Sequence, residues 1–261
     1  MKIEMKTKLL LPLLLITATS VQAQLYDNGG GLIYDSALNI TWLQDANYAQ
    51  TSGYSATGKM TWQDANTWAN NLNYFDSANG VSYTGWTLPG ALPANGTNYV
   101  TTYAADGSTD HGLNMTAGNT QLPYLFYVEL GNQGNRLTDN TNNPAYTGIM
   151  NTTFQDAAHG NASDSFINVK APKTLSEVSP QTFSDIYWTN QEESPGVAIN
   201  FFTAVGFQSQ AAESSLYYAW AVHPGNVGGS LSAVPVPAAA WLFGSGLLGL
   251  CGMKRRNSRN I

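Results

Sequence analysis

Residues 25–46 have the sequence LYDNGGGLIYDSALNITWLQDA, and this stretch decides how the folded part of the chain begins. Two short runs within it, Gly31–Tyr34 and Asn39–Leu43, are rich in apolar, aromatic and β-branched residues. The polar segment DSAL separates them. Short apolar runs on either side of a polar turn are typical of paired strands. The stretch therefore predicts a β-hairpin near the start of the domain.

The clearest helix lies in the segment MTWQDANTWANNL, residues 60–72, after a polar stretch at 48–59 that is expected to be a loop. Thr61 is the expected N-cap, and Asp64 follows it by three residues, which is an acidic variant of the capping box. One apolar face is expected to contain Trp62, Ala65, Ala69 and Leu72. Trp68 falls outside that face.

The rest of the chain is expected to alternate between polar loops and strands. LPYLFYVELGN predicts a second, shorter helix that ends at Gly131. The last third predicts strands within residues 184–190, 196–210 and 215–225. Together these elements predict an α+β domain with two helices, short antiparallel sheets and long polar loops, in which the terminal strands can pair.

The composition indicates one exported domain over residues 24–233, called the body below. The body has four basic and sixteen acidic residues, a formal charge of −12. Such a charge disfavours nucleic acid and anionic lipid as partners. Cys251, the single cysteine, lies outside the body, so the body has no disulfide.

The first 23 residues have the layout of a secretory signal peptide. Three lysines precede an apolar run at Leu9–Ile16, and small or polar residues follow up to Ala23. The run is too short to cross a bilayer. Export, with cleavage after Ala23, is therefore expected, and the export machinery is an expected partner.

The C-terminal segment is a short apolar helix with a basic end. Ala238–Met253 would span about 24 Å as a helix, against a hydrocarbon core of about 30 Å. Four glycines weaken it, and a basic cluster would hold its end in the cytoplasm. This favours transient membrane insertion, with a permanent tail anchor as the alternative.

The order of landmarks in the body resembles the Lcl C-terminal-like family of exported bacterial domains. The landmarks are GLIYDSALNITWLQDANYA, MTWQDANTWANNL, GWTLP, YVELGN, NTTFQ, IYWTNQE and YYAWAVHPGNVG. The resemblance implies a C-type-lectin-like fold, related to that of formylglycine-generating enzymes, in which the first and last strands come together. Thr87 and His223 stand where the family commonly has arginine, so contacts made by those arginines are not carried over.

The tail at residues 234–259 resembles the PEP-CTERM sorting signal, with Val236 in place of the usual glutamate. The residues that carry the resemblance are Pro235, Pro237, Trp241, Lys254, Arg255 and Arg256. The resemblance implies recognition by an exosortase, a membrane-embedded protease, with cleavage near the prolines. It also implies association with extracellular polysaccharide.

The body offers no enzymatic signature. A nucleophilic site needs an activated side chain beside a base, and neither a suitable motif nor a cysteine is present. Acidic loops around Asp106, Asp110 and Asp139 have the composition of calcium-binding loops, although none matches the EF-hand template. Calcium is therefore a weak alternative, and no other cofactor is expected.

The tryptophans suggest two candidate ligand contacts. Trp42, Trp62 and Trp220 lie within expected elements and are assigned to the core. Trp68 and Trp86 are the candidates for contact with a glycan. The sequence thus predicts a non-enzymatic, exported surface or matrix protein with a structural or adhesive role. The alternatives are a carbohydrate-binding module, with or without calcium, and a permanently anchored envelope protein.

Overall fold

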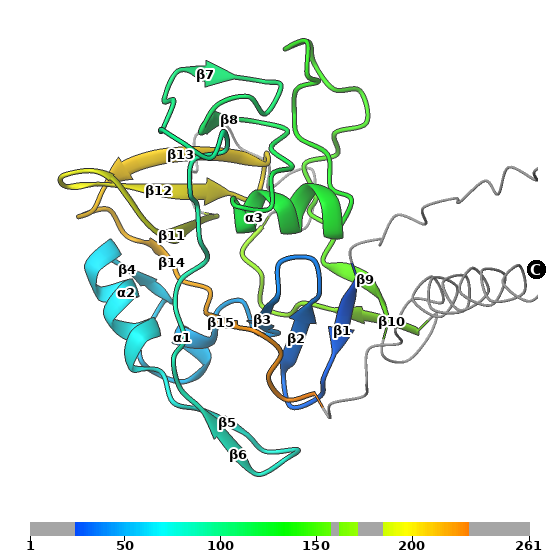
Figure 1. Ribbon diagram of the computed structural model, residues 1–261, viewed down its shortest axis with the longest axis vertical. Coiled ribbons are helices and arrows are strands. Elements are labelled where there is room, and N and C mark those ends of the chain that lie inside the picture. Colours follow the sequence, from blue (N-terminus) through cyan, green and yellow to red (C-terminus); the bar gives the residue numbers. More distant parts are fainter. Residues whose placement is uncertain (1–23, 158–161, 172–184, 230–261) are drawn as a thin grey trace, which may run out of the picture.

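The computed structural model describes residues 24–157, 162–171 and 185–229, which form a mixed α/β fold dominated by strands (Figure 1). Two mixed sheets, one separate hairpin and three short helices make up this part of the chain. The sequence-predicted processing residues lie outside the described residues: Ala23, Pro235, Pro237, Trp241, Lys254, Arg255 and Arg256.

The first sheet has six strands in the order β10-β9-β1-β2-β3-β15. Their bounds are β1 Leu25–Asp27, β2 Leu32–Asp35, β3 Ile40–Leu43, β9 Thr153–Asp156, β10 Ala162–Ser165 and β15 Val222–Pro224. The predicted hairpin is confirmed as β2 and β3, which pair antiparallel from Leu32↔Leu43 to Asp35↔Ile40. The Asp35 carboxylate accepts hydrogen bonds from the backbone N–H groups of Ala37 and Leu38, and this closes the turn.

The two ends of the body meet in this sheet, as the sequence suggested. The last strand, β15, pairs antiparallel with β3, through Val222↔Trp42 and Pro224↔Ile40, and not with β1. The indole N–H of Trp220 also donates to the Leu43 carbonyl oxygen at 2.7 Å. The C-terminal end of the body is therefore fixed to the N-terminal hairpin.

The second sheet has seven strands in the order β4-β14-β11-β12-β13-β8-β7. Their bounds are β4 Lys59–Met60, β7 Tyr103–Ala104, β8 His111–Gly112, β11 Ile186–Ser194, β12 Val197–Phe202, β13 Phe207–Ala212 and β14 Tyr217–Tyr218. The long β11–β12 and β12–β13 hairpins form its centre. A separate hairpin, β5 Tyr74–Asp76 and β6 Val81–Tyr83, extends from the opposite end of the molecule (Figure 1).

The expectation of purely antiparallel sheets is wrong. β1 pairs parallel with β9, β11 with β14, and β7 with β8. The β1–β9 and β11–β14 pairs each consist of a single register contact between segments far apart in the sequence. Contacts of this kind leave no periodic pattern in the sequence.

The described chain has three short helices, one more than expected. α1 (Tyr48–Thr51) is a single turn inside the stretch that was expected to be a loop. α2 (Trp62–Asn71) begins at Thr61, whose hydroxyl oxygen accepts from the Asp64 N–H, so the predicted cap is confirmed. α3 (Gln121–Tyr124) continues as the π-helical turn η1 (Leu125–Glu129).

One aromatic core joins the two sheets. Trp220 lies at its centre, with ring centroids 5.1 Å from Trp42, 5.0 Å from Phe166 and 5.7 Å from Tyr187. All four side chains are buried. This confirms the core assignment of Trp42 and Trp220, whereas Trp62 is only half-buried. Within residues 24–157, 162–171 and 185–229, no helix has the length and apolar character needed to cross a membrane.

Candidate functional site

Trp86 is a core residue, so the structure corrects its assignment as a candidate glycan contact. Its side chain is fully buried, and its indole N–H donates to the Tyr83 carbonyl oxygen at 2.8 Å. The ring packs edge-on against Tyr74 and His223. An irregular segment does not expose a tryptophan when side chains of neighbouring elements cover its ring.

Trp68 is also largely buried, with only 3% of its surface exposed, which corrects its placement outside the apolar face of α2. The buried positions of the helix are Ala65, Trp68 and Ala69. With the half-buried Leu72 they follow the i, i+3, i+4, i+7 pattern of a core-facing stripe. Ala65, Ala69 and Leu72 were expected on this face, whereas Trp68 was not, and Trp62 is only half-buried at its edge.

Trp68 nevertheless lines a hollow on the surface, which we call the Tyr54 hollow. It has a volume of about 300 Å³ and is lined by Ser52, Gly53, Tyr54, Trp68, Asn71, Leu72 and Asn73. One side comes from the end of α1 and the turn after it, and the other from the last turn of α2. No side chain in this lining carries a formal charge.

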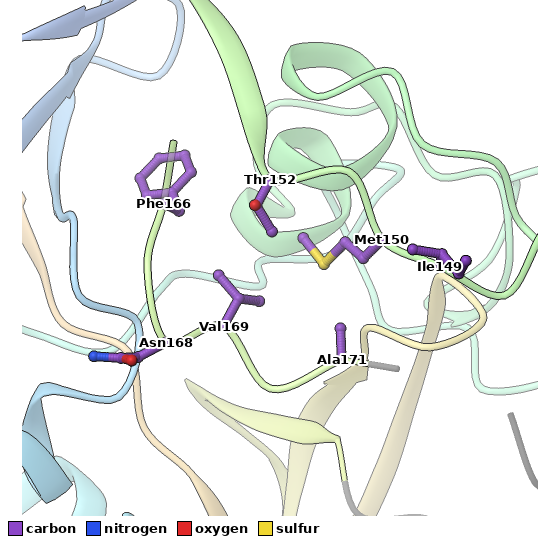
Figure 2. Close-up of a pocket in the computed structure, with 7 residues that line it drawn as sticks. All are labelled: Ile149, Met150, Thr152, Phe166, Asn168, Val169 and Ala171. Carbon is purple, nitrogen blue, oxygen red and sulfur yellow. The ribbon is translucent and has the colours of Figure 1, made fainter. Parts of the chain in front are cut away.

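A second hollow, of about 350 Å³, lies where two segments of the middle of the chain meet (Figure 2). It is lined by Ile149, Met150, Thr152, Phe166, Asn168, Val169 and Ala171. Five of these seven side chains are apolar. The Asn168 side-chain amide donates to the Asp45 carboxylate at 2.9 Å. This hollow has neither a titratable group nor an exposed aromatic ring for a ligand.

The three aspartates considered for calcium make local hydrogen bonds instead of sharing a site. The exposed Asp106 and Asp139 each accept from the backbone N–H and hydroxyl of a residue two positions ahead, Ser108 and Thr141 respectively. These hydrogen bonds lower the pKa of both carboxyls. The buried Asp110 accepts from the backbone N–H groups of Ala94 at 2.6 Å and Val100 at 2.8 Å.

Asp110 thus holds the 94–100 loop, and Asp106 and Asp139 each close a turn. Across the described ranges, no group of three or more His, Cys, Asp or Glu side chains is arranged to hold a metal ion.

Sequence analysis missed a pair of carboxyl groups, the buried Asp35 and the partly buried Glu129. Asp35 is fully buried and accepts from Ala37, Leu38 and the Trp42 indole N–H. Burial, and then the charge of Asp35, raise the pKa of Glu129 to about 8. Burial also raises the pKa of Asp35, despite the hydrogen bonds that lower it. Glu129 therefore keeps its proton at neutral pH and donates it in a hydrogen bond to Asp35.

A second group of carboxyls lies where β1, β9 and β10 meet. Burial, and then a hydrogen bond with Asp164, raise the pKa of Asp27 to about 6. The backbone N–H of Asp27 donates to the buried Asp156 at 3.0 Å. The sequence held no signal for either group, because their members are far apart along the chain.

No protein-family model, no curated protein and no solved structure matches this chain.

Proposed function

We propose that the chain is an exported surface or extracellular-matrix protein with a structural or adhesive role, processed at both ends. The observation that carries the proposal is the meeting of the two ends of the described body. The Asn28 side-chain amide donates to the Asn226 side chain and to the Val227 carbonyl oxygen, each at 2.7 Å. Gly228 packs against Leu32 at the same edge.

This arrangement supports processing because residues 226–228 are held by the N-terminal strands through contacts that lie within the body. The last strand, β15, is already paired with β3 before the tail begins. Removal of residues 1–23, or of the tail after the body, would therefore leave the sheet and its core in place. The expected partners are the export machinery and an exosortase-type membrane protease, with transient membrane insertion of the tail.

For the body we propose a C-type-lectin-like arrangement. The support for this proposal is that β15 lies beside the N-terminal hairpin, while α2 and α3 come between the two in the sequence. Long loops, such as residues 84–102 and 130–152, fit the variable face of such a domain. We propose a non-enzymatic role for this body.

The test is the intact mass of the mature protein, taken separately from culture medium and from membranes. A medium species that begins at Gln24 and ends near Pro235, with or without an added mass, supports release or attachment after processing. A membrane species that still ends at Ile261 would instead make the tail a permanent anchor. A chain found only in the cytoplasm, with Met1 or Lys2 at its start, would refute export.

The alternative function, carbohydrate binding, is favoured by the Tyr54 hollow, where an exposed aromatic ring and two asparagine side chains meet.

A further inference from the structure

Trp68 differs from the other tryptophans of the described chain in what its indole N–H contacts. The other five donate to a protein oxygen: Trp42, Trp62, Trp86, Trp188 and Trp220. Among the described residues, the Trp68 N–H has no such acceptor, and it is not one of the buried unpartnered polar atoms. It therefore reaches solvent, although 97% of the side chain around it is covered. Buried tryptophans normally find a partner for this group.

The Trp68 side chain lines the Tyr54 hollow. Tyr54 contributes a ring that is 56% exposed, at the rim of the hollow. The turn before it depends on Gly53, whose positive φ of 77° is accessible to glycine at little cost. The hollow thus has an exposed aromatic ring beside a tryptophan whose N–H has no protein acceptor among the described residues.

Two asparagines complete the polar part of the lining. The Asn71 amide N–H donates to the Thr67 carbonyl oxygen at 2.9 Å, which orients the side chain and leaves its own oxygen as an acceptor. Asn73 is exposed. Together with the Ser52 hydroxyl these groups offer donors and acceptors, and none carries a charge.

We propose that the Tyr54 hollow is a binding site for a neutral sugar ring, of the hexose type, within a glycan. A sugar ring has an apolar C–H face, which suits the Tyr54 ring, and hydroxyl edges, which suit the Trp68 N–H and the amides. The volume of about 300 Å³ is at the lower end of small-molecule sites, so one ring fits better than an extended chain.

The charge of the site and of the body selects the class of sugar. A carboxylated or sulfated sugar needs a cation nearby, but the hollow has none. The body has a formal charge of −12, which repels acidic polymers over a longer range. This inference deepens the proposed function, because it names the class of polysaccharide that the exported domain would contact.

The test uses the full-length chain in a detergent without a sugar headgroup, and measures ligand binding by saturation-transfer NMR and by indole N–H chemical shifts. The probes are methyl glucoside, methyl galactoside, methyl mannoside and N-acetylglucosamine, with methyl glucuronide as the acidic comparison. At least one neutral probe should bind with a Kd of about 1 mM, a typical affinity for a small contact area. The Trp68 indole resonance should shift.

Three variants separate the site from a general loss of structure. Trp68→Phe keeps most of the buried volume but removes the N–H, and should weaken binding about fivefold. Tyr54→Ala, at an exposed position that tolerates truncation, should weaken it about tenfold. Tyr103→Ala removes another exposed tyrosine, 47% accessible and remote in sequence, and should bind as the unchanged chain does.

The proposal is overturned if no neutral probe binds at a concentration about 50-fold above the expected Kd. It is also overturned if the Tyr54→Ala variant binds as the unchanged chain does, or if the glucuronide binds more tightly than every neutral probe. These outcomes are independent of localisation. An exported protein that fails to bind these sugars would leave the proposed function standing, and a sugar-binding protein that is never exported would refute only the proposed function.

Discussion

Replacement of Glu129 by glutamine should remove much of the pH dependence of folding stability. The pKa of Glu129 is raised from an ordinary 4.5 to about 8, first by burial and then by Asp35. Below pH 4.5 the carboxyl is protonated in both the folded and the unfolded chain, so its full stabilisation is present. As the pH rises towards 8, only the unfolded chain releases the proton, and the free energy of unfolding decreases.

The size of the effect follows from the pKa difference. A rise from 4.5 to about 8 corresponds to at most about 5 kcal/mol at about 1.36 kcal/mol per pKa unit. Glu129 is partly exposed and shares its proton with Asp35, so water screening reduces the expected loss to about 2 kcal/mol. For a domain of this size, that equals a decrease in Tm of about 4–8 °C between pH 5 and pH 8.

Thermal unfolding followed by circular dichroism at pH 5, 6, 7 and 8 measures this directly. Glu129→Gln keeps a donor towards Asp35 but cannot ionise, so it should match the unchanged chain at pH 5 and exceed its Tm at pH 8. Glu192→Gln, at the exposed end of β11, is the control and should leave the slope unchanged. Parallel Tm profiles for the Glu129→Gln variant and the unchanged chain would refute the shared-proton interpretation. The pKa of Asp27, about 6, leaves a smaller slope of the same sign in both proteins.

Three further predictions concern stability. Thr61→Ala removes the side-chain cap of α2 and should lower the free energy of unfolding in urea by about 1 kcal/mol; an unchanged urea midpoint would argue against the cap. Asp110→Ala leaves the N–H groups of Ala94 and Val100 without their acceptor and should cost about 1–3 kcal/mol, while Asp106→Ala, at an exposed turn, should cost far less. A chain that stops after Gly229 should unfold at the same temperature as the full chain, because β15 and the contacts up to Gly228 are retained; a lower Tm would mean that later residues contribute to folding.

Local signals in the sequence predicted the local elements of the fold. The β2–β3 hairpin and the α2 cap depend on residues within four positions of one another, such as Asp35 with Leu38 and Thr61 with Asp64. The partners of each sheet strand depend on distant segments. The parallel contact Leu25↔Asp156 joins residues that are about half the chain length apart. Neither residue propensity nor hydrophobic periodicity could therefore indicate it.

The candidate site also separates what the local sequence indicates from what depends on the folded structure. Composition drew attention to Trp68 and Trp86, but whether a tryptophan is a core residue or a ligand contact depends on where its N–H finds an acceptor. For Trp86 the acceptor is the Tyr83 carbonyl oxygen, three residues away, and the indole is satisfied within the protein. For Trp68 the described chain supplies none, and its side chain lines the Tyr54 hollow.

The difference between these two tryptophans also explains why burial alone is a poor guide to function in this domain. Trp68 and Trp86 are both almost completely covered, so their exposed areas would place both in the core. The two residues differ because the Trp68 N–H has no protein acceptor among the described residues. A polar group that stays hydrated in the folded protein carries no free-energy cost until a ligand displaces its water. A ligand that binds at Trp68 must therefore replace the lost hydrogen bond to water, which a sugar hydroxyl does and an apolar ligand does not. Binding of a purely apolar probe in the Tyr54 hollow, with no change on Trp68→Phe, would contradict this argument.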